Sequence, residues 1–256
     1  MKTKSLGFIG GGRITRIILQ ALTNKKVELK SVVVFDTNAE VLSALKAQFP
    51  FITTGDLQQV ASQPTIFIAL HPPMVIETLE TIVNKIADNA LVISLAPKIT
   101  IEKIAAKLKT TLIVRMIPNA TSYINEGYNP VAYHPNMTKG DKKAIQKLLS
   151  ILGKTFETDE AKLESYAITS AMLPTYFWFQ FQEIEKVARQ MGLTSDEASK
   201  TIQSTLKKAI KLYFNSGLSP AEVMDLIPVK PIGENEEQIA EIYQAKLLGL
   251  FAKIKP

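Results

Sequence analysis

The stretch LGFIGGGRIT, residues 6–15, decides the fold. A short apolar run at residues 6–9 is typical of a buried strand, and the apolar residues in 14–22 recur at helical spacing. Three glycines, residues 10–12, separate the two. A glycine-rich turn between strand and helix indicates a loop that holds a dinucleotide pyrophosphate, although a merely structural turn gives the same letters.

Composition narrows the class of protein. The chain has 256 residues, 46% of them hydrophobic and 21% charged, as in ordinary globular proteins. It has no cysteine, which excludes disulfides and thiolate metal sites and favours a reducing compartment. With two histidines we expect no metal site, and His134 is expected to be structural. The net charge of +6 comes from scattered lysines, so we expect no nucleic-acid partner.

The apolar runs also bear on location. No run approaches the roughly 18 residues that a membrane span needs, so no membrane partner is expected. The glycines at residues 10–12 interrupt the first apolar run too early for a signal peptide. We therefore expect a cytoplasmic protein.

Strand and helix patterns alternate through the first half of the chain. The predicted strands are continuous apolar runs rather than alternating ones, which indicates burial on both faces of a parallel sheet. They fall at residues 6–9, 31–36, 65–70, 90–95 and 111–117, and residues 130–157 complete the sheet. The pattern predicts an α/β fold with a doubly wound, Rossmann-type dinucleotide-binding domain over residues 1–157.

The glycine turn and the second strand make a specific cofactor prediction. Gly10 would permit the tight turn, and Gly12 would let the backbone approach the pyrophosphate. Thr15 takes the place of the third glycine, and its bulk is expected to push the helix slightly from the strand. Asp36 ends the second predicted strand, where an acid binds the adenosine ribose hydroxyls. Alternatively, Asp36 merely caps the next helix, as Asn38 also would.

Asp36 bears on the choice of cofactor as well. A carboxylate there would repel a 2′-phosphate, and residues 37–39 supply no arginine to neutralise one. We therefore expect NAD(H) to be favoured over NADP(H).

The second half, residues 158–256, is predicted to be an all-helical domain. Pro174 is expected to kink or restart its first helix. Thr194 with Glu197 forms a capping box, and Ser219 with Pro220 opens a further helix.

Five of the six residues 176–181, YFWFQF, are aromatic, and they lie on nearly all sides of the predicted helix. Such a helix must be surrounded, either inside its own helical domain or by a second subunit, and aromatic groups on all sides exceed what three companion helices can cover. We expect it to lie at a subunit interface, so the domain is predicted to dimerise the chain, in a homodimer or higher homo-oligomer.

Motifs along the chain resemble those of one family, the pyrroline-5-carboxylate reductases, which reduce a cyclic imino acid to proline with NAD(P)H. Residues 7–12 are similar to its GFIG-G-G turn, and residues 69–72 to its Ala-x-Lys-Pro stretch. Residues 115–119 keep the arginine, proline and asparagine of its Arg-x-Met-Pro-Asn motif. Residues 192–193 and 219–223 resemble two of its loops. The resemblance implies a Rossmann domain followed by an interlaced helical dimer.

Two departures from the family concern the substrate. Where the family has Ser-Gly-Ser-Gly-Pro-Ala-Tyr, residues 170–176 keep only the first serine, the proline and the tyrosine. Met172 and Leu173 are expected to crowd the site where the substrate carboxylate would bind. Its Pro-Gly-Gly-Thr-Thr loop falls near residues 229–234, which contain no threonine. Lys230 could replace the lost carboxylate-binding groups, or it is a solvated loop lysine.

Three hypotheses for function follow. The first is an NAD(P)H-dependent oxidoreductase acting on a C=N group of pyrroline-5-carboxylate, in proline biosynthesis. The second is a related reductase or dehydrogenase with a different small substrate, and the third is a non-catalytic dinucleotide-binding homologue.

No catalytic residue is assigned. His71 is a candidate proton donor, and the alternative is that it is simply a turn residue. The cofactor-binding candidates are Gly10, Gly11, Gly12, Arg13, Ile14, Asp36, Thr37, Asp56, Ala69, Leu70, His71 and Pro72, and the substrate-binding candidates are Asn119, Ser170 and Lys230.

Overall fold

The computed structural model describes residues 4–256 and divides the chain into two compact units. The first unit holds the residues up to 172 together with residues 251–256, and the second holds residues 173–250. The first unit thus extends beyond the expected boundary at residue 157. The reason is that Leu163 and Ala167 are buried in its core.

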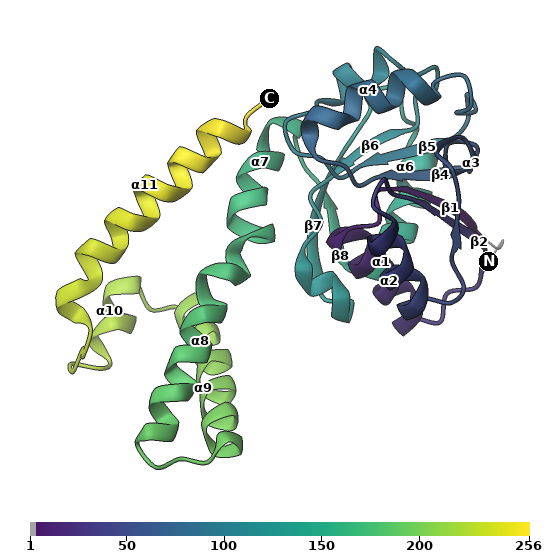
Figure 1. The fold of residues 1–256 in the computed structure, drawn as a ribbon. Coiled ribbons are helices and arrows are strands. Elements are labelled where there is room, and N and C mark those ends of the chain that lie inside the picture. The colour runs from purple at the N-terminus through teal and green to yellow at the C-terminus, as the bar shows by residue number, and fades with distance from the viewer. Residues whose placement is uncertain (1–3) are drawn as a thin grey trace. The chain divides into compact units, whose positions relative to one another are not determined.

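The strands of the described residues form one eight-stranded sheet in the order β3-β2-β1-β4-β5-β6-β7-β8 (Figure 1). The strands β1 to β6 run parallel, which confirms the doubly wound, Rossmann-type arrangement. Their bounds are β1 (Lys4–Ile9), β2 (Leu29–Phe35), β3 (Thr53–Thr54), β4 (Thr65–Ile68), β5 (Leu91–Ser94), β6 (Ile113–Met116), β7 (Gly127–Tyr133) and β8 (Gly153–Glu157).

The sheet is mixed rather than wholly parallel, which corrects the expectation. Strand β7 runs antiparallel to β6, and β8 is parallel to β7. The link between β6 and β7 carries only the 3₁₀ turn η1 (Ala120–Ile124). A parallel crossover needs a dozen or more residues, so this short link can only return an antiparallel strand.

Helices cover both faces of the sheet. They are α1 (Arg13–Asn24), α2 (Ala39–Gln48), α3 (Leu57–Ala61), α4 (Pro72–Ile82), α5 (Ile101–Ala105), α6 (Lys139–Leu149) and α7 (Leu163–Tyr166), with 3₁₀ turns η2 (Ser150–Leu152) and η3 (Glu160–Lys162) and the π-helix η4 (Ala167–Ala171). The short elements β3 and α3 were not predicted from the sequence, because a two-residue strand and a five-residue helix leave little periodic pattern.

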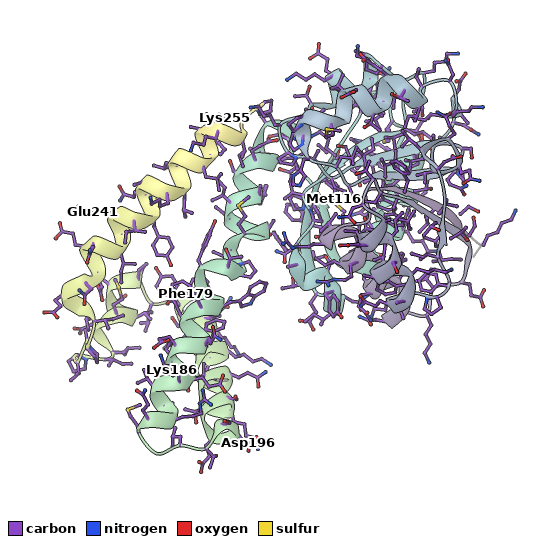
Figure 2. All side chains as sticks on the ribbon, in the orientation of Figure 1. Met116, Phe179, Lys186, Asp196, Glu241 and Lys255 are labelled. Atoms are coloured by element: carbon purple, nitrogen blue, oxygen red, sulfur yellow. The ribbon has the colours of Figure 1, made fainter. Side chains whose placement is uncertain are left out.

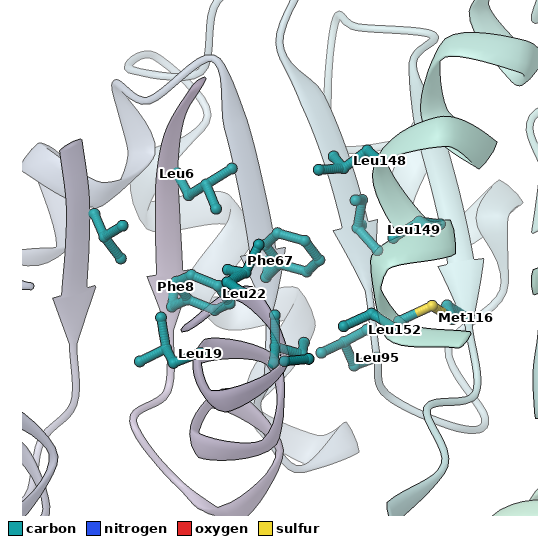
Figure 3. Close-up of a cluster of buried hydrophobic side chains, with 14 of the residues drawn as sticks. Leu6, Phe8, Leu19, Leu22, Phe67, Leu95, Met116, Leu148, Leu149 and Leu152 are labelled. Atoms are coloured by element: carbon teal, nitrogen blue, oxygen red, sulfur yellow. The ribbon is translucent and has the colours of Figure 1, made fainter. Parts of the chain in front are cut away.

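Two buried clusters fill the space between the sheet and these helices, as continuous apolar strands require. One contains Phe8 and Phe67, whose rings stack with centroids 4.8 Å apart, together with Leu19 of α1 (Figure 3). The other contains Ile9 from the opposite face of β1 and Leu79 of α4. Since adjacent strand residues point to opposite faces, the apolar run of β1 supplies both cores.

The second unit is helical, as predicted. It contains α8 (Leu173–Gln190), α9 (Ser195–Asn215), α10 (Pro220–Asp225), the 3₁₀ turn η5 (Gly233–Asn235) and most of α11 (Glu236–Ile254). Pro174 is the second residue of α8, which starts afresh after the π-helix. The capping boxes of Thr194 and Ser219 are both present.

The second unit leaves most of its apolar surface uncovered. Among its residues, only Ala188 and Ala198 are buried. Phe179, labelled in Figure 2, is 63% exposed, and Trp178 beside it is 50% exposed. Single chains rarely expose contiguous apolar surface on this scale. Within residues 4–256, no helix has the length and apolarity to cross a membrane.

Candidate dinucleotide-binding site

The glycine turn between β1 and α1 passes close to the backbone that follows β4. Gly10 has a φ of +103°, and a Cβ atom on it would lie 2.4 Å from the carbonyl oxygen of Ala69. The amide of Ala69 in turn donates to the carbonyl of Ile9 at 2.8 Å. Only glycine fits here, since a side chain would meet both an unfavourable φ and the backbone that follows β4.

Gly12 faces open space instead. It is the N-cap residue of α1, and a Cβ atom on it would meet no heavy atom within 4 Å. No side chain caps this end of the helix, so the first amides of α1 lack a capping partner. Free amides and the positive end of the helix dipole favour an anion such as a pyrophosphate.

Thr15 stands where the third glycine of the fingerprint would be. Its side chain is fully buried, and its hydroxyl donates a 2.6 Å hydrogen bond to the carbonyl of Gly10. The hydroxyl thus ties the helix to the turn. The small displacement of the helix that its bulk predicts stays a prediction.

Asp36 braces the same turn from the end of β2. Its Oδ2 accepts from the amide of Gly11 at 2.7 Å, and its Oδ1 accepts from the amide of Asn38 at 2.8 Å. Asn38, not Asp36, caps α2, because its side chain accepts from the amides of Glu40 and Val41. The capping alternative for Asp36 is therefore wrong. The carboxylate lies beside the glycine turn, as ribose binding requires.

A cavity of about 730 Å³ opens at the carboxyl ends of the strands, where ligands bind in open α/β sheets. Its volume lies within the range of small-molecule sites. It is lined by Gly11, Gly12, Arg13, Ile14, Arg16, Val41, Ala44, Leu45, Gln48, Ala69, Leu70, His71, Pro72, Leu95, Pro97, Ile117, Pro118, Ala167, Ala171 and Met172.

The lining brings together eight of the twelve cofactor-binding candidates. Gly10, Asp36 and Thr37 do not line the cavity, although Gly10 precedes the lining residue Gly11 and Asp36 accepts from the amide of Gly11. Asp56 caps α3 in a box with Gln59, which occupies its carboxylate. No carboxylate lines the cavity, whereas Arg13 and Arg16 do, so its charge favours an anionic ligand.

Sequence reasoning missed the lining residues from several elements. The sequence could have predicted Arg16 as a lining residue, because it lies three residues after Arg13 on one helix face. Pro97, Ala167 and Ala171 had none, because only the tertiary fold brings their segments to the cavity.

His71 lies in the cavity at the start of α4. It is the N-cap residue, its side chain makes no capping hydrogen bond, and Pro72 follows at the first helical position. Its imidazole is exposed. Among the lining side chains from the ends of β4, β5 and β6, it is the one with a polar side chain that can donate or accept a proton.

The family-like motif at residues 115–119 divides into two structural roles. Arg115 is buried and pairs with Glu160 at 2.8 Å and with Glu164 at 2.5 Å. Ile117 and Pro118 line the cavity. The arginine therefore faces an ion-pair network, and the two apolar residues face the site.

Two of the substrate-binding candidates contact each other. The Nδ2 of Asn119 donates to the carbonyl of Ser170 at 2.9 Å and to its Oγ at 3.1 Å. The Ser170 hydroxyl donates to the carbonyl of Tyr128 at 3.0 Å. Both residues are buried, and neither lines the cavity. Lys230 is exposed in the second unit, and its role stays a prediction.

The parallel strands, the glycine turn and the cavity at the strand ends are the arrangement of the class of proteins with a Rossmann-type dinucleotide-binding fold. The family described as NADP oxidoreductase, coenzyme F420-dependent, matches residues 5–98, which run from β1 to the end of β5.

Within this class, the chain resembles the pyrroline-5-carboxylate reductases along most of its length, as the sequence motifs indicated. It is 26% identical to the reductase of Pasteurella multocida over 84% of this chain and 81% of the relative. It is 22% identical to that of Methanosarcina acetivorans over 98% and 94%. The Plasmodium falciparum pyrroline carboxylate reductase, solved with NADP bound, shares the fold with a TM-score of 0.73 and 17% identity, covering 99% of this chain and 95% of the other.

Proposed function

We propose that the protein is an NAD(P)H-dependent reductase that acts on the C=N bond of a cyclic imine of the pyrroline-5-carboxylate type, in proline biosynthesis. The observation that carries this proposal is the cavity, which begins at the glycine turn and ends among Ile117, Pro118 and Met172. It supplies a dinucleotide site and an apolar compartment at the same sheet edge. The likeness to pyrroline-5-carboxylate reductases over nearly the whole chain supports the choice of substrate class.

The residues present fit a dinucleotide. The open space in front of Gly12 and the uncapped amides of α1 suit the pyrophosphate, and Asp36 suits the ribose. When bound, the nicotinamide supplies a hydride to the imine carbon. The imine nitrogen gains a proton in the same reaction, so the protein's tasks are position, proton access and exclusion of water.

His71 is the residue of this chain that we propose gives the proton. Its side chain lines the cavity, and histidine is the side chain that most often serves as a general acid. The remaining lining at this end, including Leu95, Pro97 and Ile117, is apolar and keeps water away from the reacting carbon.

We further propose that NADH is preferred over NADPH. Asp36 keeps a carboxylate beside the ribose position, and Thr37 and Asn38 bring no positive charge. Arg13 and Arg16 line the cavity on the α1 side and act on the pyrophosphate in this proposal.

The working form is proposed to be a homodimer, or a higher oligomer, in the cytoplasm. The support is the uncovered apolar surface of the second unit, in which Phe179 and Trp178 are at least half exposed. We propose that Asn119 and Ser170 shape the substrate side by fixing the chain before Met172. Lys230 is proposed as the carboxylate anchor.

A second candidate function is the reduction of a different small substrate. Met172 lines the cavity where the family has a small polar segment, which favours a substrate with less polar surface. An NAD(P)H oxidation assay over a panel of cyclic imines, with and without a carboxylate, separates the two. Turnover only of imines without a carboxylate favours the second candidate, and no turnover of any imine contradicts the first.

A further inference from the structure

The loop between β5 and α5 contains an unusual backbone conformation next to the cavity. Lys98 has a φ of +71°, in the left-handed region that non-glycine residues rarely adopt. Its side chain is exposed, while Pro97 before it lines the cavity. The conformation of residue 98 thus determines where the cavity wall lies.

A buried carboxylate holds this conformation. The amide of Lys98 donates to Oε1 of Glu164 at 2.9 Å, and the same oxygen accepts from Arg115 Nη2 at 2.5 Å. Arg115 and Glu164 are each 1% exposed. Glu160 accepts from the other arginine nitrogen at 2.8 Å and from the amide of Ile101 at 2.7 Å, which fixes the far end of the loop.

The same carboxylate belongs to the segment that leads into another part of the cavity lining. Glu164 lies in α7, and the π-helix that follows carries Ala167 and Ala171, both lining the cavity. Isolated π-turns are frequent at functional sites. One side chain therefore connects the wall formed by Pro97 with the wall formed by these two alanines.

We propose that Glu164 is a positioning residue for the reaction. Its Oε1, held by Arg115, keeps Lys98 in the left-handed conformation and so sets the position of Pro97 relative to Ala167 and Ala171 at the substrate end of the cavity. The turnover assays below rest on the proposed reductase function, whereas the amide-exchange assay does not.

The test uses the full-length protein and a double variant. Glu164→Leu removes the acceptor of the Lys98 amide, and we expect turnover to fall about tenfold or more, since small displacements of a site wall slow reactions strongly. Adding Lys98→Gly removes the need for the acceptor, because glycine adopts a positive φ without strain. We expect the double variant to regain most of the turnover but not the melting temperature, because Arg115 still lacks one of its two carboxylate partners. Glu164→Gln keeps an acceptor and should stay close to wild type.

A double variant as slow as Glu164→Leu alone, or a fully active Glu164→Leu, overturns the proposal. Glu80→Leu removes an exposed ion pair with Lys107 and serves as the control, with no expected change.

If Glu164→Leu does not fold, substitutions of the exposed residue Lys98 still test the proposal. Lys98→Val disfavours the left-handed backbone without touching the ion pairs, and we expect a loss of turnover that Lys98→Gly does not show. Equal turnover of these two variants contradicts the proposal. If wild type reduces no imine, hydrogen exchange at the Lys98 amide remains as the readout. Faster exchange in Glu164→Leu than in Glu80→Leu supports the proposal that Glu164 holds the Lys98 amide, and equal exchange overturns it.

Discussion

The amide of Gly11 donates a 2.7 Å hydrogen bond to Oδ2 of Asp36 and joins the glycine turn after β1 to the end of β2. The other carboxylate oxygen accepts from the amide of Asn38. Asp36 is therefore fixed by two backbone groups, and its negative charge stands at the edge of the turn. The residue that is proposed to bind the ribose also shapes the loop that is proposed to bind the pyrophosphate.

Gly12→Val is expected to abolish binding of both NADH and NADPH. A Cβ atom at residue 12 would meet no heavy atom within 4 Å, so valine should extend into the open space in front of α1 and folding should be preserved. Fluorescence titration with each dinucleotide checks this, and a circular dichroism spectrum checks the fold. Gly140→Val, at an exposed position of α6, is the control and should bind normally. Unchanged affinity of Gly12→Val for both dinucleotides would show that the glycine turn is not part of the binding site.

Asp36→Asn is expected to shift preference towards NADPH by about tenfold, because it removes the repulsion of a 2′-phosphate at short range. Asparagine loses the charge and keeps an oxygen for the amide of Gly11, but its Nδ2 cannot accept from the amide of Asn38, so one of the two hydrogen bonds remains. Asp36→Ser removes both and should also weaken NADH binding. A wild type that already binds NADPH tenfold more tightly than NADH would show our interpretation of Asp36 to be wrong.

Arg115→Leu is expected to lower the free energy of unfolding by about 3–5 kcal/mol, since it leaves the buried Glu164 without its charged partner. Lys107→Leu breaks the exposed pair with Glu80 and should cost no more than about 1 kcal/mol. Urea denaturation of both variants gives the comparison. Equal losses would mean that the buried network contributes no more than a surface pair.

Light scattering of the wild type is expected to show at least a dimer at micromolar concentration. Phe179→Lys should shift it towards monomer, because a charge on this exposed aromatic position opposes burial against a second copy. Phe51→Lys changes an exposed aromatic side chain of the first unit and is the matched control. A monomeric wild type contradicts the proposed assembly.

Local patterns predicted much of this fold. The turn at Gly10, the capping box of Thr194, the N-cap at Ser219 and the restart of the helix at Pro174 each depend on residues close in sequence, so the sequence shows them directly. The continuous apolar strands likewise predicted burial on both faces of the sheet.

Long-range pairing could not be predicted in the same way. Arg115 finds its partners 45 and 49 residues later in the chain, and no spacing rule connects such positions. This pairing anchors residues beyond the expected domain boundary to the first unit. The antiparallel course of β7 depends on the length of one link, and the cavity walls depend on where the π-helix lies.

The central claim is that this chain transfers hydride from a nicotinamide cofactor to a cyclic imine. The most direct measurement is the oxidation of NADH and NADPH, followed at the absorbance of the reduced nicotinamide, with pyrroline-5-carboxylate and with imines lacking its carboxylate. The account predicts cofactor oxidation that depends on a cyclic imine, is faster with NADH and is absent in Gly12→Val. Binding of the dinucleotide without oxidation by any imine would contradict it and would leave a nucleotide-binding protein without this activity.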